Sequence, residues 1–288
     1  MPDGIIVINK PQDWTSMDVC AKLRGVFHEK RVGHAGTLDP MATGVLPVFV
    51  GQATKAVSFA EDGKKEYRAR LRLGVTTDTQ DIWGTVLSES AVNVSESDLR
   101  AVLPRFTGEI EQVPPMYSAI KVQGQKLYDL ARKGIEVERK PRRITIYELE
   151  LLERDETGGW GLRVVCSKGT YIRTLCHDIG AALGCGGCMS SLTRTMAAGF
   201  TLDEAVTLED AQARGAKLLR PVDSLFRQYP AYRIDYAEAE RRCRCGNPIR
   251  AFNSKDGMYR VYGQDGAFLA LSRCENGVLT SVKNFFST

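Results

Sequence analysis

The candidate for acid, base or nucleophilic chemistry is Asp39, which lies in a loop of glycine and turn-forming residues from Gly33 to Gly44. Pro40 follows it, and because proline keeps the preceding residue extended, the carboxylate is held outside any regular ladder of hydrogen bonds. A carboxylate presented in this way can attack a carbon atom or accept a proton. The structural alternative is an aspartate that caps a helix or closes a turn.

Two further residues could support such a carboxylate. Tyr171 and Arg173 open a predicted helix directly after residues 167–169, Ser-Lys-Gly. At a helix start the backbone N–H groups are free, and together with a guanidinium they can hold a carboxylate in its charged form. The alternative for Arg173 is a surface position on the helix.

Metal and nucleotide chemistry has less support. His34 is one of three histidines, and the sequence contains neither the HExxH pattern nor the GxxxxGK[ST] pattern. The eight cysteines include the pairs Cys185/Cys188 and Cys243/Cys245, which could supply four thiolates to a tetrahedral zinc ion. These pairs fall on opposite sides of the predicted domain boundary, so we favour reduced, unligated cysteines and keep zinc as an alternative.

The positive charge is concentrated in particular segments. With 43% hydrophobic and 26% charged residues the composition is that of a globular protein, and a net charge of +4 does not by itself indicate a nucleic-acid partner. Between Lys121 and Arg143, eight basic residues stand against three acidic ones, so this segment carries +5 and the rest of the chain about −1. Such a local field suits a phosphate backbone. A second basic cluster, from Arg241 to Arg250, has four arginines and no acid; the alternative for both is a solvated surface.

These residues depend on the elements around them. The sequence predicts a strand at 4–9, a helix capped by Ser16, a strand at 45–50 and a half-buried strand at 65–73. In that last strand, alternation places Tyr67 on the buried face. Other predicted elements are helices at 95–106, 126–133 and 170–183, a helix begun by a Thr201/Glu204 capping box, and strands at 144–152 and 160–166.

A domain boundary is predicted near Tyr229-Pro230, where the segments become short. The tail has strand-like pieces at 259–261, 268–271 and 278–282, which favours a small β-barrel-like module. No apolar run is long enough to span a bilayer and the first residues lack the pattern of a signal peptide, so we expect a cytoplasmic protein with free thiols. Without a large unpaired apolar stripe, we also expect a monomer.

Several segments taken together resemble the TruB type of pseudouridine synthase, which makes pseudouridine in the T-loop of tRNA, at position 55. The resemblance runs from Gly4 to about Phe226, with the family's two N-terminal signatures in order and spacing. The matching segments are Asn9-Lys10-Pro11, Thr15-Ser16, Gly33 to Pro40, Ala42 to Pro47, Lys65-Glu66-Tyr67, Gly74 to Asp81, Pro114 to Ala119, Leu127-Tyr128, Ala131-Arg132 and Ser167 to Arg173.

The resemblance implies a fold of the α+β class and a division into two parts. Residues 1–228 would form the pseudouridine synthase fold, a mixed, mainly antiparallel sheet with flanking helices and a central cleft. Residues 229–288 would form a small β-rich, PUA-like RNA-binding module. The basic segment falls in a mobile insertion at about 114–143 that closes over the RNA. The residues expected at the RNA backbone are Lys121, Lys126, Arg132, Lys133, Arg142 and Arg143.

By the same resemblance, Asp39 is the catalytic carboxylate, Tyr67 packs on the target base and Arg173 pairs with Asp39. His34 would occupy the space of the extruded nucleotide. The other residues expected to bind substrate are Tyr171 and Leu192, in the wall of the uridine pocket, with Lys10 and Asp78.

The implied reaction is an isomerisation that breaks N1–C1′, rotates the uracil and forms C5–C1′, so it needs no cofactor and no energy source. A base in folded RNA must first leave its stack, and Tyr67 and His34 suit the flat face and the plug that this requires. Asp39 could attack C1′, attack C6 or assist proton removal at C2′, and the sequence leaves these routes open. Tyr67 could also help to remove the C5 proton.

The chain departs from the family pattern at two places. Cys188 stands where the pattern has a histidine, and residues 192–195 are Leu-Thr-Arg-Thr instead of Leu-Arg-Arg-Thr. Because Leu192 is retained, we expect an intact pocket wall. The pair Cys185/Cys188 has no functional explanation.

Two other functions remain as alternatives. One is a guide-RNA-dependent relative within a ribonucleoprotein, against which the basic insertion and the compact tail argue. The other is an RNA-binding or tRNA-folding protein without catalysis, against which Asp39, Tyr67 and Arg173 argue. We therefore expect a stand-alone enzyme whose partner is tRNA, at its T-loop and T-stem, with no obligatory protein partner and no membrane association.

Overall fold

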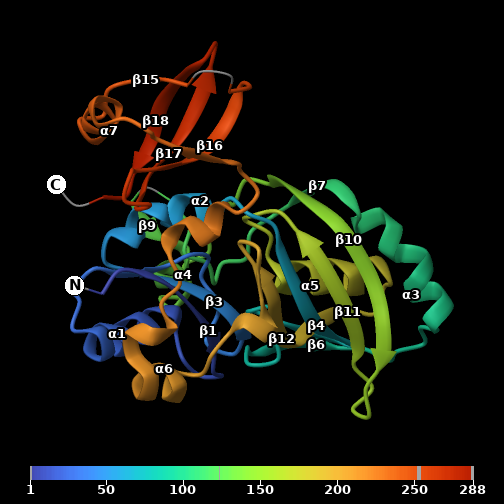
Figure 1. Ribbon diagram of the computed structural model, residues 1–288. Coiled ribbons are helices and arrows are strands. Elements are labelled where there is room, and N and C mark those ends of the chain that lie inside the picture. The colour runs from blue at the N-terminus through green and yellow to red at the C-terminus, as the bar shows by residue number, and fades with distance from the viewer. Residues whose placement is uncertain (1, 123, 252–253, 287–288) are drawn as a thin grey trace.

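The computed structural model describes residues 2–122, 124–251 and 254–286. A mixed, mainly antiparallel sheet forms its centre (Figure 1). The strands of this sheet are β1 (Gly4–Lys10), β2 (Val32–His34), β3 (Thr43–Val50), β4 (Lys65–Leu73), β7 (Gly108–Gln112), β10 (Arg142–Arg154), β11 (Trp160–Cys166), β12 (Gly187–Ala197) and β13 (Phe200–Thr201). Their order is β1-β3-β12-β4-β11-β10-β7, with β2 on β3 and β13 on β12. β3 and β12 run parallel.

Helices and short hairpins surround this sheet. The part that precedes residue 229 is called the catalytic part after its predicted role. Its α-helices are α1 (Ser16–Phe27), α2 (Val57–Glu61), α3 (Glu96–Val102), α4 (Leu127–Ala131), α5 (Ile172–Ala182) and α6 (Leu208–Arg214). The 3-10 helices are η1 (Gly51–Ala56), η2 (Leu103–Phe106), η3 (Leu202–Glu204), η4 (Gly215–Leu218) and η5 (Val222–Phe226). Two hairpins pair β5 (Val75–Thr77) with β6 (Val86–Glu89) and β8 (Lys121–Val122) with β9 (Gln125–Lys126).

Two helices cover the same face of the sheet, α1 over its β1 end and α5 over its middle strands. Val19 and Leu23 of α1 pack in one apolar cluster with residues of β1 and β3. Leu175 and Ile179 of α5 pack in another with residues of β4 and β12. Each buried leucine-sized side chain contributes about 1.5–3 kcal/mol, so both helices are held firmly on the sheet. The Asp39 loop lies between them.

Most predicted elements of the catalytic part are confirmed, and two helix starts are corrected. Thr15, not Ser16, caps α1, because its hydroxyl accepts from the Asp18 N–H while the Asp18 carboxylate accepts from the Thr15 N–H. The Thr201/Glu204 capping box is present, but it closes the single turn η3. The next helix, α6, has a cap of its own, Thr207, six residues after Thr201.

One strand at the centre of the sheet is absent from the sequence-based prediction. Residues 187–197 form β12, which lies between β3 and β4. Its pairing with β4 shifts register twice, between Met189 and Ser191 and between Arg194 and Met196. These irregularities interrupt the alternation of apolar and polar residues by which a strand is recognised in sequence.

The C-terminal part forms a second sheet. Its strands are β14 (Ala231–Arg233), β15 (Ile249–Arg250), β16 (Gly257–Tyr262), β17 (Phe268–Glu275) and β18 (Val278–Asn284), in the order β14-β16-β17-β18-β15. The three predicted strands are confirmed, whereas α7 (Ala237–Arg244) was not predicted. The proposed boundary at 228/229 falls between η5 and β14. Phe226 packs against Phe268 and Phe285 there and joins the module to the catalytic part.

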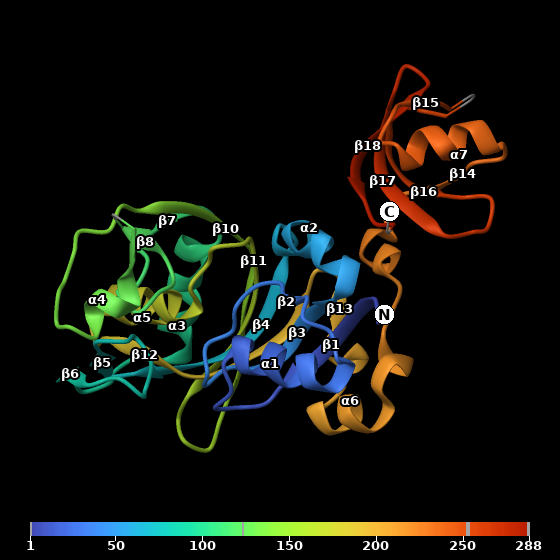
Figure 2. The same cartoon turned by 90° about the vertical axis from the view of Figure 1, so that its left-hand side faces the viewer.

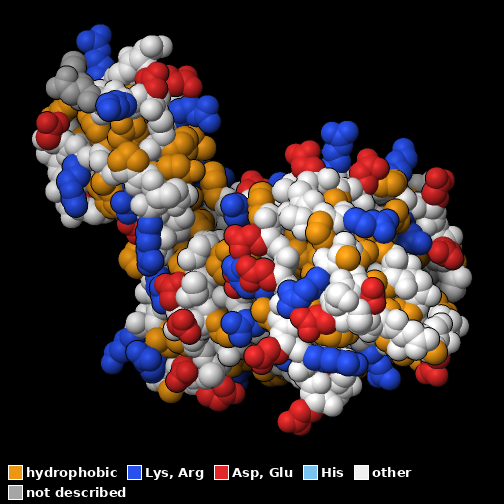
Figure 3. Space-filling view, turned by 90° about the vertical axis from the view of Figure 1, so that its right-hand side faces the viewer, with side chains coloured by type: hydrophobic (Ala, Val, Ile, Leu, Met, Phe, Trp, Pro, Cys, Tyr) orange, Lys and Arg blue, Asp and Glu red, His pale blue; other side chains and the backbone are white. Residues whose placement is uncertain are grey.

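The module and the basic insertion lie at opposite ends of the catalytic part (Figure 2). The insertion has a small apolar core of its own, formed by Met116, Leu127 and Leu130. On the face in Figure 3, basic and acidic side chains are intermixed over the catalytic part, without a field of one sign. No helix in the described ranges is both long enough and apolar enough to cross a membrane.

Candidate active site

Two buried side chains, Lys10 and Ser16, bind the backbone of the Asp39 loop, one on each side of Asp39. The Lys10 amine donates to the carbonyl of Pro40, at 3.0 Å, and to the carbonyls of Pro11 and Trp14 in the turn between β1 and α1. The Ser16 hydroxyl accepts from the N–H of Leu38 at 2.9 Å and donates to its carbonyl. The backbone is therefore fixed immediately before and immediately after Asp39.

A third buried side chain holds the two ends of this loop. Arg194 Nη2 donates to the Gly36 carbonyl at 2.9 Å, and Nε donates to the Val45 carbonyl at 2.7 Å. Arg194 has no exposed surface. Its Nη1 is buried without a hydrogen-bond partner among the described residues.

The register of the strands places these groups in one row across the sheet. Lys10 of β1 lies opposite Gly44 of β3, and Gly44 lies opposite Arg194 of β12. Arg194 in turn lies opposite Tyr67 of β4. Paired residues of neighbouring strands point to the same face, so these residues form one row on the face of the sheet that the Asp39 loop covers.

Asp39 and Arg173 form an ion pair, with 2.9 Å between Asp39 Oδ2 and Arg173 Nε. Arg173 Nη1 donates to the Thr79 carbonyl and Nη2 donates to the Tyr117 carbonyl. The Arg173 side chain is 6% exposed, whereas that of Asp39 is 39% exposed. A buried arginine thus presents a carboxylate that remains open to solvent.

A second carboxylate shares this arginine. Asp81 Oδ2 lies 3.6 Å from Arg173 Nη1, and Asp81 also accepts from the Thr79 hydroxyl and the Trp83 N–H. Burial raises the pKa of Asp81. Asp81 occurs in a matching segment of the sequence, but no local pattern indicates that its side chain turns toward residue 173, which lies 92 positions away.

The start of α5 is fixed by another residue that sequence reasoning missed. Gln112, at the end of β7, accepts from the Tyr171 N–H at 2.8 Å and donates to the Tyr171 carbonyl at 3.0 Å. It is 3% exposed. The signal available in the sequence was a glutamine two residues before Pro114, where a strand must end.

Apolar residues form the wall beside Asp39. Tyr67, Leu192, Leu38 and Met41 belong to one buried cluster, and Tyr67 and Leu192 are each 7% exposed. Burial raises the pKa of the Tyr67 phenol, the Asp39 charge adds to this rise, and the Arg194 guanidinium opposes it. The ring therefore carries a neutral hydroxyl at neutral pH.

His34 lies on the same side of the site. It pairs with Val48 of β3 and is half-buried. Burial, and then the charge of Arg194, lower the pKa of His34. Its Nδ1 is buried and has no hydrogen-bond partner in the described part of the chain. The imidazole is consequently neutral at neutral pH.

Two residues expected to bind substrate serve the protein's own backbone. Lys10 has no exposed surface, and burial lowers its pKa to about 8. Asp78 accepts from the Thr85 N–H at 2.7 Å, inside its own turn, and from the Tyr117 hydroxyl at 3.4 Å. For Lys10 this placement supports a role in holding the Asp39 loop.

The basic residues expected at the RNA backbone lie on the insertion and on the strand that follows it. All but one are exposed: Lys121, Arg132, Lys133, Arg142 and Arg143. Lys126 is half-buried, and its amine donates to the Tyr128 hydroxyl. The second basic cluster is different, because Arg241 and Arg244 pair with carboxylates of their own helix.

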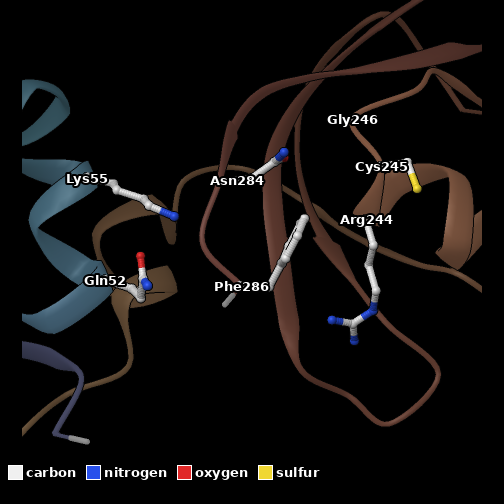
Figure 4. Close-up of a pocket in the computed structure, with 7 residues that line it drawn as sticks. All are labelled: Gln52, Lys55, Arg244, Cys245, Gly246, Asn284 and Phe286. Atoms are coloured by element: carbon white, nitrogen blue, oxygen red, sulfur yellow. The ribbon is translucent and has the colours of Figure 1, made fainter. Parts of the chain in front are cut away.

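Neither of the two cavities described here includes Asp39. One, of about 270 Å³, lies in the insertion among Pro114, Ile120 and Leu127. The other, of about 280 Å³, lies between η1 and the C-terminal module (Figure 4), where Lys55 extends toward the module. Cys245 lines this second cavity and is exposed.

The cysteines do not come together as a metal site in the described ranges. Cys185 and Cys188 are buried at the start of β12, whereas Cys243 and Cys245 belong to α7 and the residue that follows it. Across residues 2–122, 124–251 and 254–286, no group of three or more metal-ligating side chains is found. The eight thiols are free.

Comparison with known proteins places the chain among enzymes of one family. A family model described as "TruB family pseudouridylate synthase (N terminal domain)" matches residues 24–172. A second, "tRNA pseudouridylate synthase B C-terminal domain", matches residues 173–227. A protein of Alkaliphilus oremlandii named tRNA pseudouridine synthase B is 53% identical over 265 residues, 91% of this chain and 88% of the relative. One of Clostridium kluyveri with the same name is 44% identical over 289 residues, 98% and 99% of the two chains.

Solved structures extend the likeness over the whole fold. A chain in the crystal structure of a Cbf5-Nop10-Gar1 complex has a TM-score of 0.73 at 27% identity, covering 98% of this chain and 85% of that one. A chain of an archaeal box H/ACA sRNP Nop10-Cbf5 complex has a TM-score of 0.69 at 25% identity, covering 98% and 86%. The likeness therefore includes both sheets.

Proposed function

The chain belongs to the TruB family of pseudouridylate synthases, and from that membership we propose that it isomerises uridine to pseudouridine in the T-loop of tRNA, with Asp39 as the catalytic carboxylate. The relatives that match most of its length are named tRNA pseudouridine synthase B. The observation that carries the assignment of Asp39 is its ion pair with the buried Arg173, made from a loop that is held on both sides.

The chemistry asks for a carboxylate that can reach the ribose or the uracil without a cofactor. Asp39 is exposed enough to meet a substrate, while Arg173, fixed by two carbonyls, orients it. Attack at C1′, attack at C6 and assistance at C2′ all use this group, and each returns it unchanged once the C5–C1′ bond has formed and the C5 proton has been removed. Because N1–C1′ is broken and C5–C1′ is made within one nucleotide, no oxidant, reductant or hydrolytic water takes part.

The uridine would enter as a nucleotide turned out of the T-loop. We propose that the Tyr67 ring packs on the uracil, with Leu192 and Tyr171 in the pocket wall. A neutral, half-buried His34 would fill the space that the uracil leaves in the RNA. Tyr67, whose phenol is protonated at rest, suits stacking, and it can assist removal of the C5 proton only if its own proton leaves in the same step.

The T-stem and T-loop would lie against the insertion. The exposed lysine and arginine side chains of the insertion can neutralise phosphates. This neutralisation is the main source of affinity for a folded RNA. The PUA-like module lies at the other end of the molecule and would contact the same RNA farther along. Residues 1–228 and 229–288 are the two proposed domains. We propose that a monomer acts on free tRNA in the cytoplasm, without a protein partner.

The test is conversion of an unmodified tRNA transcript by the purified protein, scored by pseudouridine mapping. We expect conversion of one T-loop uridine, and Asp39→Asn should slow the single-turnover rate by at least about 10²-fold while the Kd for tRNA changes little. Asp62→Asn is the matched control, because this aspartate is exposed and pairs with Lys168 away from the loop.

Two outcomes would overturn the assignment. If Asp39→Asn converts tRNA at the wild-type rate, the carboxylate is not catalytic. If the wild type binds the transcript and converts nothing, the chain is an RNA-binding protein or a guided enzyme, and addition of a guide RNA with its partner proteins separates the two.

A further inference from the structure

Arg194 is a buried cation that no carboxylate neutralises within the described residues. Two of its nitrogens donate to the carbonyls of Gly36 and Val45, and its third, Nη1, is buried with no hydrogen-bond partner in the ranges that the structure describes. A charged group removed from water is costly unless it is paired. Because both hydrogen bonds of this buried cation go to carbonyls around one loop, they point to a role in that loop.

The position of Arg194 in the sheet gives it contact with two parts of the proposed site at once. On one side its register partner is Gly44, the residue at which the Asp39 loop enters β3. On the other side its register partner is Tyr67, whose phenol is close enough for the Arg194 charge to act on it. No other residue of the row borders both the loop and Tyr67.

The loop is packed directly on this guanidinium. A Cβ placed on Gly36 would lie 3.2 Å from Arg194 Nη1 and 3.1 Å from Lys65 Cε. Gly36 has φ +71°, a backbone conformation that disfavours any residue with a side chain. The shape of the loop at this point therefore follows the guanidinium that lies below it.

We propose that Arg194 is a positioning residue for the isomerisation, which holds the Asp39 loop and the Tyr67 side chain in one fixed relation. The planar guanidinium donates in several directions at fixed angles, so it can reach the carbonyls at the two ends of the loop together. A lysine is a point charge on a flexible stem and cannot reproduce both bonds. Since Arg194 has no exposed surface, it does not contact RNA and should not contribute to tRNA affinity.

This inference rests on the proposed function, and it is tested with Arg194→Met and Arg194→Lys in the full-length protein. We expect single-turnover conversion of tRNA by Arg194→Met to fall by about 10²-fold or more, with the Kd within about threefold of wild type. Arg194→Lys should recover less than a tenth of the lost rate. Millimolar guanidinium ion should restore part of the rate of Arg194→Met, which an equal concentration of urea should not.

Arg163→Met is the matched control, because Arg163 lies in the same sheet and points to the opposite face. It pairs with Glu66, Glu148 and Glu150 on that opposite face, away from the side chains of Arg194 and Tyr67. Its loss should lower the Tm and leave the rate within about threefold of wild type. A rate loss in Arg194→Met that matches that of Arg163→Met at equal Tm would overturn the proposal.

Hydrogen exchange provides a measure that does not depend on activity. Peptides that cover residues 33–44 should exchange faster in Arg194→Met and Arg194→Lys than in the wild type, and unchanged in Arg163→Met. If the wild type fails to convert tRNA, the proposed function fails while the exchange result still decides the role of Arg194. Unchanged exchange of the loop in both variants would refute that role.

Discussion

Besides Arg173, which pairs with Asp39, three basic side chains near the Asp39 site have little or no exposed surface and donate to backbone carbonyls instead of to carboxylates. Lys10 and Arg194 hold the Asp39 loop, and Lys65 donates to the carbonyls of Glu61 and Gly63 at the start of β4. Such bonds do not neutralise the three cations. They fix the backbone and at the same time leave positive charge below a surface that must receive a polyanion.

The buried amine of Lys10 makes stability depend on pH in a defined direction. Burial lowers its pKa to about 8, whereas the unfolded chain keeps about 10.4. Between these values the unfolded state holds a proton that the folded state has released, so a rise in pH favours the folded state, by up to about 3 kcal/mol. We expect the unfolding free energy of wild type minus that of Lys10→Met to increase from pH 8 to pH 10 in urea denaturation. A difference that stays flat or falls would contradict the buried amine.

Among the residues of the site, Arg173 is the one whose loss should lower the free energy of unfolding most. Arg173→Met leaves Asp81 buried beside an uncharged side chain and removes the partner of Asp39, so we expect the unfolding free energy to fall by about 3–5 kcal/mol. The double variant Arg173→Met with Asp81→Asn should regain part of that loss. Arg100→Met, which breaks an exposed pair with Glu96, should cost less than about 1 kcal/mol in the same urea titration.

At the scale of elements, the site depends on how β3 and β12 lie together. Gly44 has φ +99°, and a Cβ at this position would overlap the backbone oxygen of Arg194. The parallel pairing of these strands brings the end of the Asp39 loop beside Arg194, and β12 carries Leu192 on the same face. A side chain at Gly44 would force the two strands apart.

We therefore expect Gly44→Ala to lower the unfolding free energy by more than about 3 kcal/mol and to abolish conversion of tRNA. Gly108→Ala is the matched control, since Gly108 has φ +92° and open space where its Cβ would lie. It should cost only the strain of the left-handed backbone, about 1 kcal/mol. Equal losses in thermal or urea unfolding would show that strain, and not the close approach of β12, limits position 44.

At the scale of the whole molecule, the basic insertion and the C-terminal module lie at opposite ends of the catalytic part. The module joins the catalytic part through Phe226, Phe268 and Phe285 and through the Tyr262 hydroxyl, which donates to Asp223 at 2.6 Å. This apolar junction favours a fixed relation between the two sheets.

The exposed lysine and arginine side chains of the insertion should determine the salt dependence of tRNA binding. We expect replacement of Lys121, Lys133, Arg142 and Arg143 by glutamine to weaken binding and to lower the slope of log K against log salt by up to about 3.6, since each lost phosphate contact contributes about 0.9. The rate at saturating enzyme should stay within about threefold of wild type. The matched control replaces Arg241 and Arg244, which already pair with Glu238 and Glu240, and should change the slope by less than about 1. Filter binding at several salt concentrations measures both.

Helices and strands were predictable from the sequence where the periodic pattern of buried residues continues through the whole element. Residues 65–73 alternate without interruption, and β4 has those bounds. β12 was missed because two register shifts interrupt its alternation, and α7 was missed because its arginines were taken as a basic cluster without regard to the acids four positions or fewer away.

The sequence by itself determined the kind of site: a loop aspartate before a proline, an arginine at a helix start, a tyrosine on the buried face of a strand, and a basic insertion. These features follow from local periodicity, from the backbone preferences of proline and glycine, and from motifs in register. The tertiary structure alone decided that Lys10, Gln112 and Arg194 hold the site and that Asp81 shares Arg173. Arg194 meets a carbonyl 158 positions away, and because every residue offers the same carbonyl, only the packing of the strands selects which one a buried donor will reach.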